Sequence, residues 1–250
     1  MSLDLNELLG DWPHEPGMIQ VRKIQGRDGR EKLQLRIDLG LIQMEVEGRP
    51  DGHQPHGCES LFEYQRGRAE AASVKGEPFS LSAEEVSDLQ QEGLQYYHRY
   101  ISLFQLEDYR EVVRDTQRNL EMFAFVGEHA PDDDLAWSVE QFTPYVRMMN
   151  ARAKASLALQ RGDVVEAARL VEKGITKIRA FYSEAELDGE LDAESHELGF
   201  LSEWLRELRG QQPLSELQKM QFEMNQAIAS EAYERAAQLR DAIRAFQKPS

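Results

Sequence analysis

The chain has 250 residues, which is enough to bury a sizeable core and to hold more than one folding unit. Hydrophobic residues account for 41% and charged residues for 30%, values typical of a soluble, globular, helix-rich protein. The formal net charge of -16 repels phosphate backbones and opposes non-specific nucleic-acid binding. The acidity is concentrated from Ser183 to Glu203, where there is no Lys or Arg, and we interpret this segment as a solvated face.

Three features bear on the compartment. No apolar run approaches the length of a membrane-spanning helix. The first residues, MSLDLNELLGDW, lack the basic start and long apolar stretch of a secretory signal. The single cysteine, Cys58, excludes an internal disulfide and favours a reducing compartment. We therefore expect a cytoplasmic protein with no membrane contact.

The N-terminal quarter is predicted to form a small sheet. Residues 1–16 contain Pro13 and Pro16 and are expected to be irregular. In KLQLRIDL apolar and polar residues alternate, which is typical of a half-buried strand, and MIQVRKI is its predicted partner across the hairpin signal Asp28-Gly29. After Gly40 the alternation changes phase, which indicates a bulge or tight bend. Residues 17–68 are thus predicted to be a three-stranded antiparallel meander with a loop and a helix from Ser60 to Arg68.

Residues 69–82 are predicted to be a linker and residues 83–210 a helical body. Ser82-Ala-Glu-Glu85 and Asp108-Tyr-Arg-Glu111 are predicted capping boxes, each at the start of a helix. We expect the second of these helices to run to about Val126, with Gly127 and Pro131 ending it. Thr143-Pro144 indicates a helix restart, since proline is tolerated in the first turn.

Two segments of the body resemble each other. LFQLEDYREVVRD and ALQRGDVVEAARL align at an offset of 55 residues, so that Asp108 matches Asp163 and Glu111 matches Glu166. Each reads as a helix, a short polar turn, a capping carboxylate and a second helix. This pattern resembles degenerate tetratricopeptide-type (TPR-like) hairpin repeats. The alternative is two unrelated antiparallel helix pairs in a bundle.

Residues 213–248 are predicted to form an antiparallel helical hairpin after the break at Gly210–Pro213. Two apolar seams flank the predicted turn at Ser230-Glu231: Leu214, Leu217, Met220, Met224, Ala227 and Ile228, then Ala236, Leu239, Ile243 and Phe246. The small side chains of Ala236 and Ala237 would let the two helices approach closely.

The segment LSELQKMQFEMNQAIASEAYERAAQLRDAIRAF (214–246) resembles the UVR motif of the bacterial excision-repair proteins UvrB and UvrC, of which related copies occur in Clp protease regulators. Tyr233-Glu234 stands where that family usually has Phe-Glu. The resemblance implies association with another protein, often through a second UVR-type hairpin. It implies these contact residues: Met224, Tyr233, Ala236, Ala237, Arg240, Asp241 and Ile243. The alternative is that the hairpin is simply the last helix pair of the fold, packed inward.

Other classes of activity are disfavoured. There is no GxxxxGK[ST] loop, so the chain is not a helicase like UvrB. Basic and acidic residues are balanced along the hairpin, without a stripe that could grip DNA, so direct nucleic-acid binding is not expected. The stretch GREKLQLRIDLGLIQMEVEGRPDG also resembles bacterial proteins that carry this tail, which implies no particular activity.

One cluster has the donor types of a metal site. His53, His56 and Cys58 offer ligands suited to zinc within six residues, but a structural zinc takes four and no second pair is near. We interpret this segment as an ordinary loop over the sheet and expect no metal or other cofactor.

Two further clusters are interpreted as structural. Arg22, Arg30, Arg36 and Arg49 could form an anion-binding patch, or a solvated face with local acidic partners. In Tyr96-Tyr97-His98-Arg99-Tyr100 the tyrosines are predicted on a buried face, with His98 and Arg99 on the other face.

The sequence thus predicts an α+β, mostly α, fold with an N-terminal β-meander, a TPR-like body and a C-terminal helical hairpin. We expect a non-enzymatic adaptor linked to excision repair or Clp-type stress proteolysis. The alternative is a small-ligand or metal-dependent enzyme with its site around residues 49–58.

Overall fold

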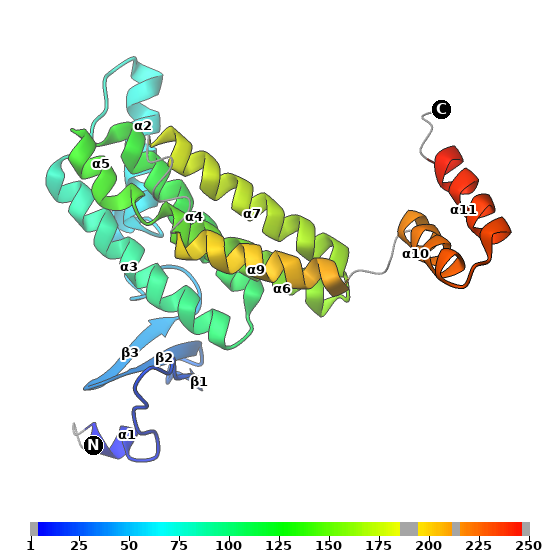
Figure 1. The fold of residues 1–250 in the computed structure, drawn as a ribbon. Coiled ribbons are helices and arrows are strands. Elements are labelled where there is room, and N and C mark those ends of the chain that lie inside the picture. Colours follow the sequence, from blue (N-terminus) through cyan, green and yellow to red (C-terminus); the bar gives the residue numbers. More distant parts are fainter. Residues whose placement is uncertain (1–4, 186–194, 212–215, 247–250) are drawn as a thin grey trace. The chain divides into compact units, whose positions relative to one another are not determined.

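The structure is a computed structural model that describes residues 5–185, 195–211 and 216–246 (Figure 1). It is mostly helical, with one small antiparallel sheet near the N-terminus and a helical hairpin near the C-terminus, which confirms the predicted fold class. The chain divides into two compact units, Met1–Arg206 and Glu207–Ser250. No helix among the described residues is long and apolar enough to span a bilayer.

The elements follow one another along the chain in two groups. The first comprises α1 (Asn6–Leu9), β1 (Val21–Gln25), β2 (Glu31–Ile37), β3 (Gly40–Glu45), the 3-10 turn η1 (Pro55–Gly57) and α2 (Leu61–Lys75). The second comprises α3 (Ala83–Gln105), α4 (Tyr109–His129), α5 (Asp133–Glu140), α6 (Thr143–Gln160), α7 (Val164–Glu184), α9 (His196–Gln211), α10 (Glu216–Ala229) and α11 (Tyr233–Phe246).

The sheet has the order β1-β2-β3, so the predicted meander is confirmed. Leu33 pairs with Met44 across β2 and β3, and both side chains are buried because they lie on the face turned towards the helices. The phase change at Gly40 is a tight turn: Ile37 pairs with Gly40, and Leu39 at the tip is 91% exposed. Reversal of the chain there exchanges the odd and even positions between the two faces.

Helix α2 is longer than predicted. The Ser60 hydroxyl caps it by accepting from the Glu63 N–H, and it ends at Gly76, whose φ of 70° is in the left-handed region that glycine adopts readily. The helix therefore runs to Lys75, into the range predicted to be a linker.

The body contains two antiparallel helical hairpins, α3–α4 and α6–α7, with α4 packed on α6 and α5 packed on α4. Helix α4 continues to His129, so the prediction that Gly127 ends it was wrong. The absence of a side chain at Gly127 instead leaves room for the Glu140 carboxylate from α5. The restart at Thr143-Pro144 is confirmed, with the proline in the first turn of α6.

The two hairpins share one turn geometry. Glu107 (φ 59°) and Gly162 (φ 76°) each adopt a left-handed conformation. The next residue donates its N–H five residues back, from Asp108 to Leu103 and from Asp163 to Ala158. This is the Schellman pattern, at the 55-residue offset of the sequence alignment.

The predicted capping boxes differ in outcome. Ser82 and Glu85 form the reciprocal pair that defines the motif, as predicted. The Asp108 side chain makes no cap; it instead forms a salt bridge to Lys23 of β1, with 3.2 Å between Asp108 Oδ2 and Lys23 Nζ. The prediction of a second capping box was therefore wrong, because a tertiary partner takes the carboxylate.

A buried ion pair fixes the connection between sheet and helices. Arg99 of α3, 1% exposed, makes a two-pronged contact with Asp115 of α4 at 2.7 and 2.8 Å. Another nitrogen of the same guanidinium donates to the Gly48 carbonyl at 2.7 Å, in the loop after β3. Arg99 was predicted on the polar face of its helix, and this was wrong because Asp115 and the loop carbonyls provide polar partners inside the core.

Glu92 is a second buried charge in the same region. Its carboxylate is fully buried and accepts the first N–H groups of α2, from Leu61 and Phe62. It also pairs with Arg118 and lies 3.2 Å from Arg49 Nε. A carboxylate at a helix N-terminus is stabilised by the helix dipole and by unpaired N–H groups. Glu92 thus ties α2, α3, α4 and the loop after β3 together.

Candidate functional site

The C-terminal hairpin consists of α10 and α11, which pack against each other. Glu231 in the connecting turn has a φ of 58°, and the Ala232 N–H donates to the Ala227 carbonyl at 2.7 Å. This is the same five-residue bond that closes the two hairpins of the body. The tight turn at Ser230-Glu231 predicted from the sequence is therefore confirmed.

A seam of small and aliphatic residues closes the hairpin. Ala227 of α10 and Ala236, Leu239 and Ile243 of α11 are each less than 9% exposed. The α11 members are spaced by three and four residues, so they lie on one face of the helix. Two predicted contact residues, Ala236 and Ile243, thus lie in the interior of the hairpin.

A second strip on α11 borders this seam. Tyr233, Ala237 and Arg240 recur at steps of four and three residues, and Asp241 lies beside them. Tyr233 is 66% exposed, Ala237 is half-buried, and Arg240 and Asp241 are exposed and paired with each other at 2.8 Å. We name these four residues the contact strip.

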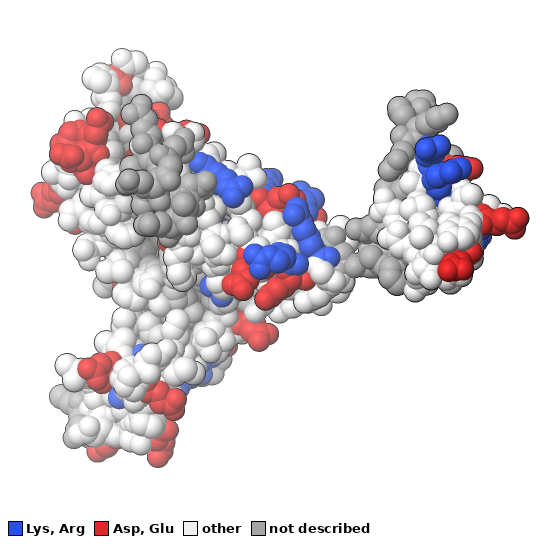
Figure 2. All heavy atoms as spheres, viewed as in Figure 1, with Lys and Arg blue, Asp and Glu red and all other residues white. Residues whose placement is uncertain are grey.

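Helix α10 contributes apolar surface near the turn. Ile228 is 49% exposed, although the sequence pattern placed it in the seam, and Met224 one turn earlier is half-buried. Ala227 faces α11, and consecutive residues of a helix point in different directions. Ile228 therefore lies outside the seam. In Figure 2 the visible face of the second unit carries both acidic and basic side chains around a largely uncharged area.

Two ion pairs lie on the surface of the hairpin among its described residues, Arg240–Asp241 and Arg235–Glu223. Arg235 of α11 lies 3.4 Å from Glu223 of α10, and both side chains are more than half exposed. Such an exposed pair stabilises a hairpin only weakly. The pair places a negative charge beside a positive one on the surface. A protein that binds a nucleic-acid backbone instead presents a stripe of basic residues.

Residues 215–248 match the family model of the UvrB/uvrC motif. The match covers the hairpin and leaves the sheet and helical body outside it. No curated protein and no solved structure matches the chain. UVR motifs mediate protein interactions in DNA repair and in Clp-associated proteins.

The loop with metal-ligand residue types has a different arrangement. The His56 ring stacks on Tyr64 with 4.0 Å between ring centroids, and the His53 backbone N–H donates to Asp51. Cys58 is a free, half-buried thiol. Within the described residues, no three His, Cys, Asp or Glu side chains are grouped to hold a metal ion. The structure therefore does not bring His53, His56 and Cys58 together as ligands.

The four arginines for which the sequence left open an anion-binding patch or a face with local partners each have a local partner. Arg22 donates to Gln34 and stacks on Trp12, and Arg30 pairs with Asp28. Arg36 donates to backbone carbonyls, including those of Trp12 and Gly40, and Arg49 lies against Asp51 and the buried Glu92. Since these groups are already paired, the interpretation as a face with local partners fits the geometry.

The tyrosine cluster of α3 is core. Tyr96 and Tyr100 are buried, and Tyr97 packs edge-on against Tyr100 with 5.5 Å between centroids. Burial raises the pKa of Tyr100 far above its usual range and lowers the pKa of His98. Tyr96 and Tyr100 therefore belong to the packed core, as expected from the sequence.

Proposed function

We propose that this protein is a non-enzymatic adaptor that docks a protein partner through its C-terminal hairpin. The observation that carries the proposal is the match of residues 215–248 to the UvrB/uvrC motif. The partner surface is a second helical hairpin, which would lie along the contact strip with its axis antiparallel or crossed at a shallow angle.

The size of the hairpin supports docking. Two helices of 14 residues each are short for independent stability in water, and units below about 40 residues usually need a metal, disulfide or partner. Among its described side chains, four aliphatic residues are buried, while Ile228 and Tyr233 are largely exposed. Covering these two side chains would add to the stability of the unit.

The contact strip has the composition of a small interface core. Tyr233 offers a large aromatic surface with a polar tip, a residue type enriched in binding hot spots. Ala237 offers no bulk, so a second helix can approach closely there. Arg240 and Asp241 form an exposed ion pair at the edge of the contact strip. An exposed pair at an interface affects the register and the choice of partner more than the affinity.

The architecture of the body fits the same role. Hairpins α3–α4 and α6–α7 share their turn and lie side by side through α4 and α6, which supports our proposal of a TPR-like helical repeat. Other owners of the UVR motif act in excision repair and in Clp-type proteolysis. We place the partner in one of these pathways and the adaptor in the cytoplasm.

The experiment compares two Ala-to-Glu changes on the same helix. Ala237→Glu puts a charge into the contact strip, whereas Ala242→Glu puts the same charge at an exposed position five residues on, on another face of α11. Purified full-length variants are used to capture partners from a native extract. The proposal requires that Ala237→Glu loses a partner that Ala242→Glu retains, with equal helicity by circular dichroism. Equal capture by both would show that the contact lies elsewhere.

A further inference from the structure

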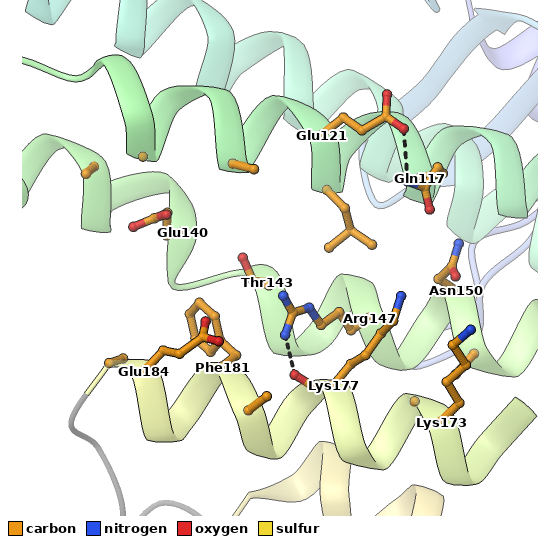
Figure 3. A pocket seen from close by; sticks show the side chains of 18 of the residues that line it. Gln117, Glu121, Glu140, Thr143, Arg147, Asn150, Lys173, Lys177, Phe181 and Glu184 are labelled. Carbon is orange, nitrogen blue, oxygen red and sulfur yellow. Dashed lines mark hydrogen bonds between the residues drawn. The ribbon is translucent and has the colours of Figure 1, made fainter.

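The helical body contains a groove that none of the preceding functions uses. It has a volume of about 1090 Å³ and is lined by α4, α5, α6 and α7 (Figure 3). All of its lining residues belong to the first unit, between Gln117 and Ala185. Its volume is slightly above the range of roughly 300–1,000 Å³ that is usual for small-molecule pockets, which suits a peptide better than a small metabolite.

Small residues form part of the groove's lining. Gly174 of α7 faces Ala151 of α6 so closely that a Cβ atom at Gly174 would lie 2.5 Å from the Ala151 Cβ. This approach holds α6 and α7 together beneath the groove. The longer side chains of α6 and α7 therefore line the same groove.

One end of the groove is basic. Arg147 and Lys154 lie seven residues apart on α6, and Lys173 and Lys177 lie four residues apart on α7, so each pair faces one side of its helix. Figure 3 shows Arg147, Lys173 and Lys177 around the same open space. In the part of the chain that the structure describes, no salt bridge joins Lys154, Lys173 or Lys177 to a carboxylate. Among the described residues these three ammonium groups have no direct ion pair; Glu166 is an electrostatic neighbour of Lys173, and Glu121 of α4 lines the same end of the groove (Figure 3).

The ionisation of this end agrees with its geometry. Burial lowers the pKa of Lys154, and the nearby charges of Lys177 and Lys173 lower it further. Burial also lowers the pKa of Arg147, and the charge of Glu184 opposes this shift; the guanidinium donates to the Lys177 carbonyl and lies 5.6 Å from the Phe181 ring centroid, so Arg147 lies between the two ends of the groove. A bound anion would relieve both the repulsion and the lost hydration.

The other end is aromatic and acidic. The Trp137 and Phe181 rings stack with 6.1 Å between centroids and 9° between planes, and Trp137 is 40% exposed. Glu140 and Glu184 lie at this end (Figure 3). Burial raises the pKa of Glu140. These carboxylates would repel a continuous phosphate backbone, so the groove is suited to a ligand whose negative charge is confined to one end.

We propose that this groove binds an acidic peptide segment of a partner protein, with its Asp and Glu side chains at Lys154, Lys173 and Lys177 and an apolar side chain on the Trp137–Phe181 stack. The binding is independent of the C-terminal hairpin. It gives the adaptor two docking surfaces, one on each unit.

The test is a binding titration with full-length protein. The probe is a short, fluorescently labelled peptide with its Glu residues at one end and its Leu residues at the other, and its control is the same peptide with Gln in place of Glu. We expect Lys173→Gln combined with Lys177→Gln to weaken Glu-Leu peptide binding roughly tenfold, and added salt to weaken wild-type binding. A matched variant, Arg66→Gln with Lys75→Gln on α2, has the same net charge and leaves the groove intact, so it should bind as the wild type does.

A second readout places the peptide in the groove. Tryptophan fluorescence should change on titration, and the part of that change due to Trp137 should vanish in Trp137→Phe. Ala237→Glu should bind the peptide normally, so failure of the hairpin proposal and failure of this one are distinguishable.

Four results would overturn the proposal. The first is equal affinity for the Glu-Leu and Gln-Leu peptides, and the second is equal weakening by the groove variant and the α2 variant. The third is no peptide binding together with self-association that the groove variant abolishes, which would make a second copy of this chain the occupant. A labelled single-stranded RNA that bound through the same lysines, more tightly than the peptide, would also contradict it.

Discussion

Replacing Asp115 with alanine tests whether the buried ion pair holds the sheet and the helices together. The change would leave Arg99, 1% exposed, with the loop carbonyls of Glu45 and Gly48 as its hydrogen-bond partners and the Tyr96 ring 4.8 Å away, and with no carboxylate among these contacts. Removing one member of a buried pair typically costs about 3–5 kcal/mol, since the remaining charge is uncompensated. In a unit of this size about 1 kcal/mol shifts Tm by roughly 2–4 °C, so we expect a fall of about 6–20 °C.

The assay is thermal unfolding of full-length protein followed by circular dichroism, with the major transition assigned to the first unit. Arg66→Ala on α2 is the control, because its pair with Glu63 is exposed and should contribute at most about 0.5 kcal/mol. The double variant Arg99→Met with Asp115→Leu removes both charges. It should be more stable than Asp115→Ala alone, although the Gly48 carbonyl loses its donor. The reasoning would be refuted if Asp115→Ala lowered Tm no more than Arg66→Ala does.

Three further predictions concern single positions. Ser82→Ala should destabilise the first unit by about 1 kcal/mol in urea unfolding, because it removes the cap of α3; an unchanged midpoint would contradict the capping role. Gly174→Ala should lower the free energy of unfolding by about 1–3 kcal/mol, because the new methyl group clashes with Ala151. Gly199 has open space around it, so Gly199→Ala should stabilise α9 by up to about 1 kcal/mol. Equal effects of the two changes in urea unfolding would contradict the close approach of α6 and α7. Burial raises the pKa of Tyr145 to about 12, above its unfolded value near 10. Its contribution to the stability of the fold is therefore complete below pH 10 and is lost as the pH rises through 12, because the unfolded chain loses this proton first. The free energy of unfolding of Tyr145→Phe should therefore fall less steeply between pH 10 and pH 12 than that of the wild type. Parallel curves of unfolding free energy against pH would exclude this contribution.

Much of the fold could be predicted because its signals are local. The alternation around Leu33 and Leu35, the Asp28-Gly29 turn and the Ser82 cap depend on residues near one another in sequence. The C-terminal hairpin could be predicted for the same reason, since its seam and its turn at Glu231 are close together along the chain.

What could not be predicted depends on contacts between distant residues. Arg99 is buried because Asp115 and the loop after β3 meet it, and Asp108 leaves its cap because Lys23 is nearby. Helical periodicity does not indicate that Arg99 meets Asp115 and the loop after β3, or that Asp108 meets Lys23. The basic groove had a usable signal: Lys173 and Lys177 share a face of one helix, and Arg147 and Lys154 share a face of the one before it. That signal becomes a site only once α6 and α7 are known to pack together.

The most direct test of the adaptor account is partner capture from native extract by full-length protein and its Ala237→Glu variant, quantified by mass spectrometry, with Ala242→Glu as the matched control. The account predicts that one protein is retained by the wild type and Ala242→Glu and lost from Ala237→Glu, and that this protein itself carries a helical hairpin. Identical sets of captured proteins from all three would contradict docking through the contact strip.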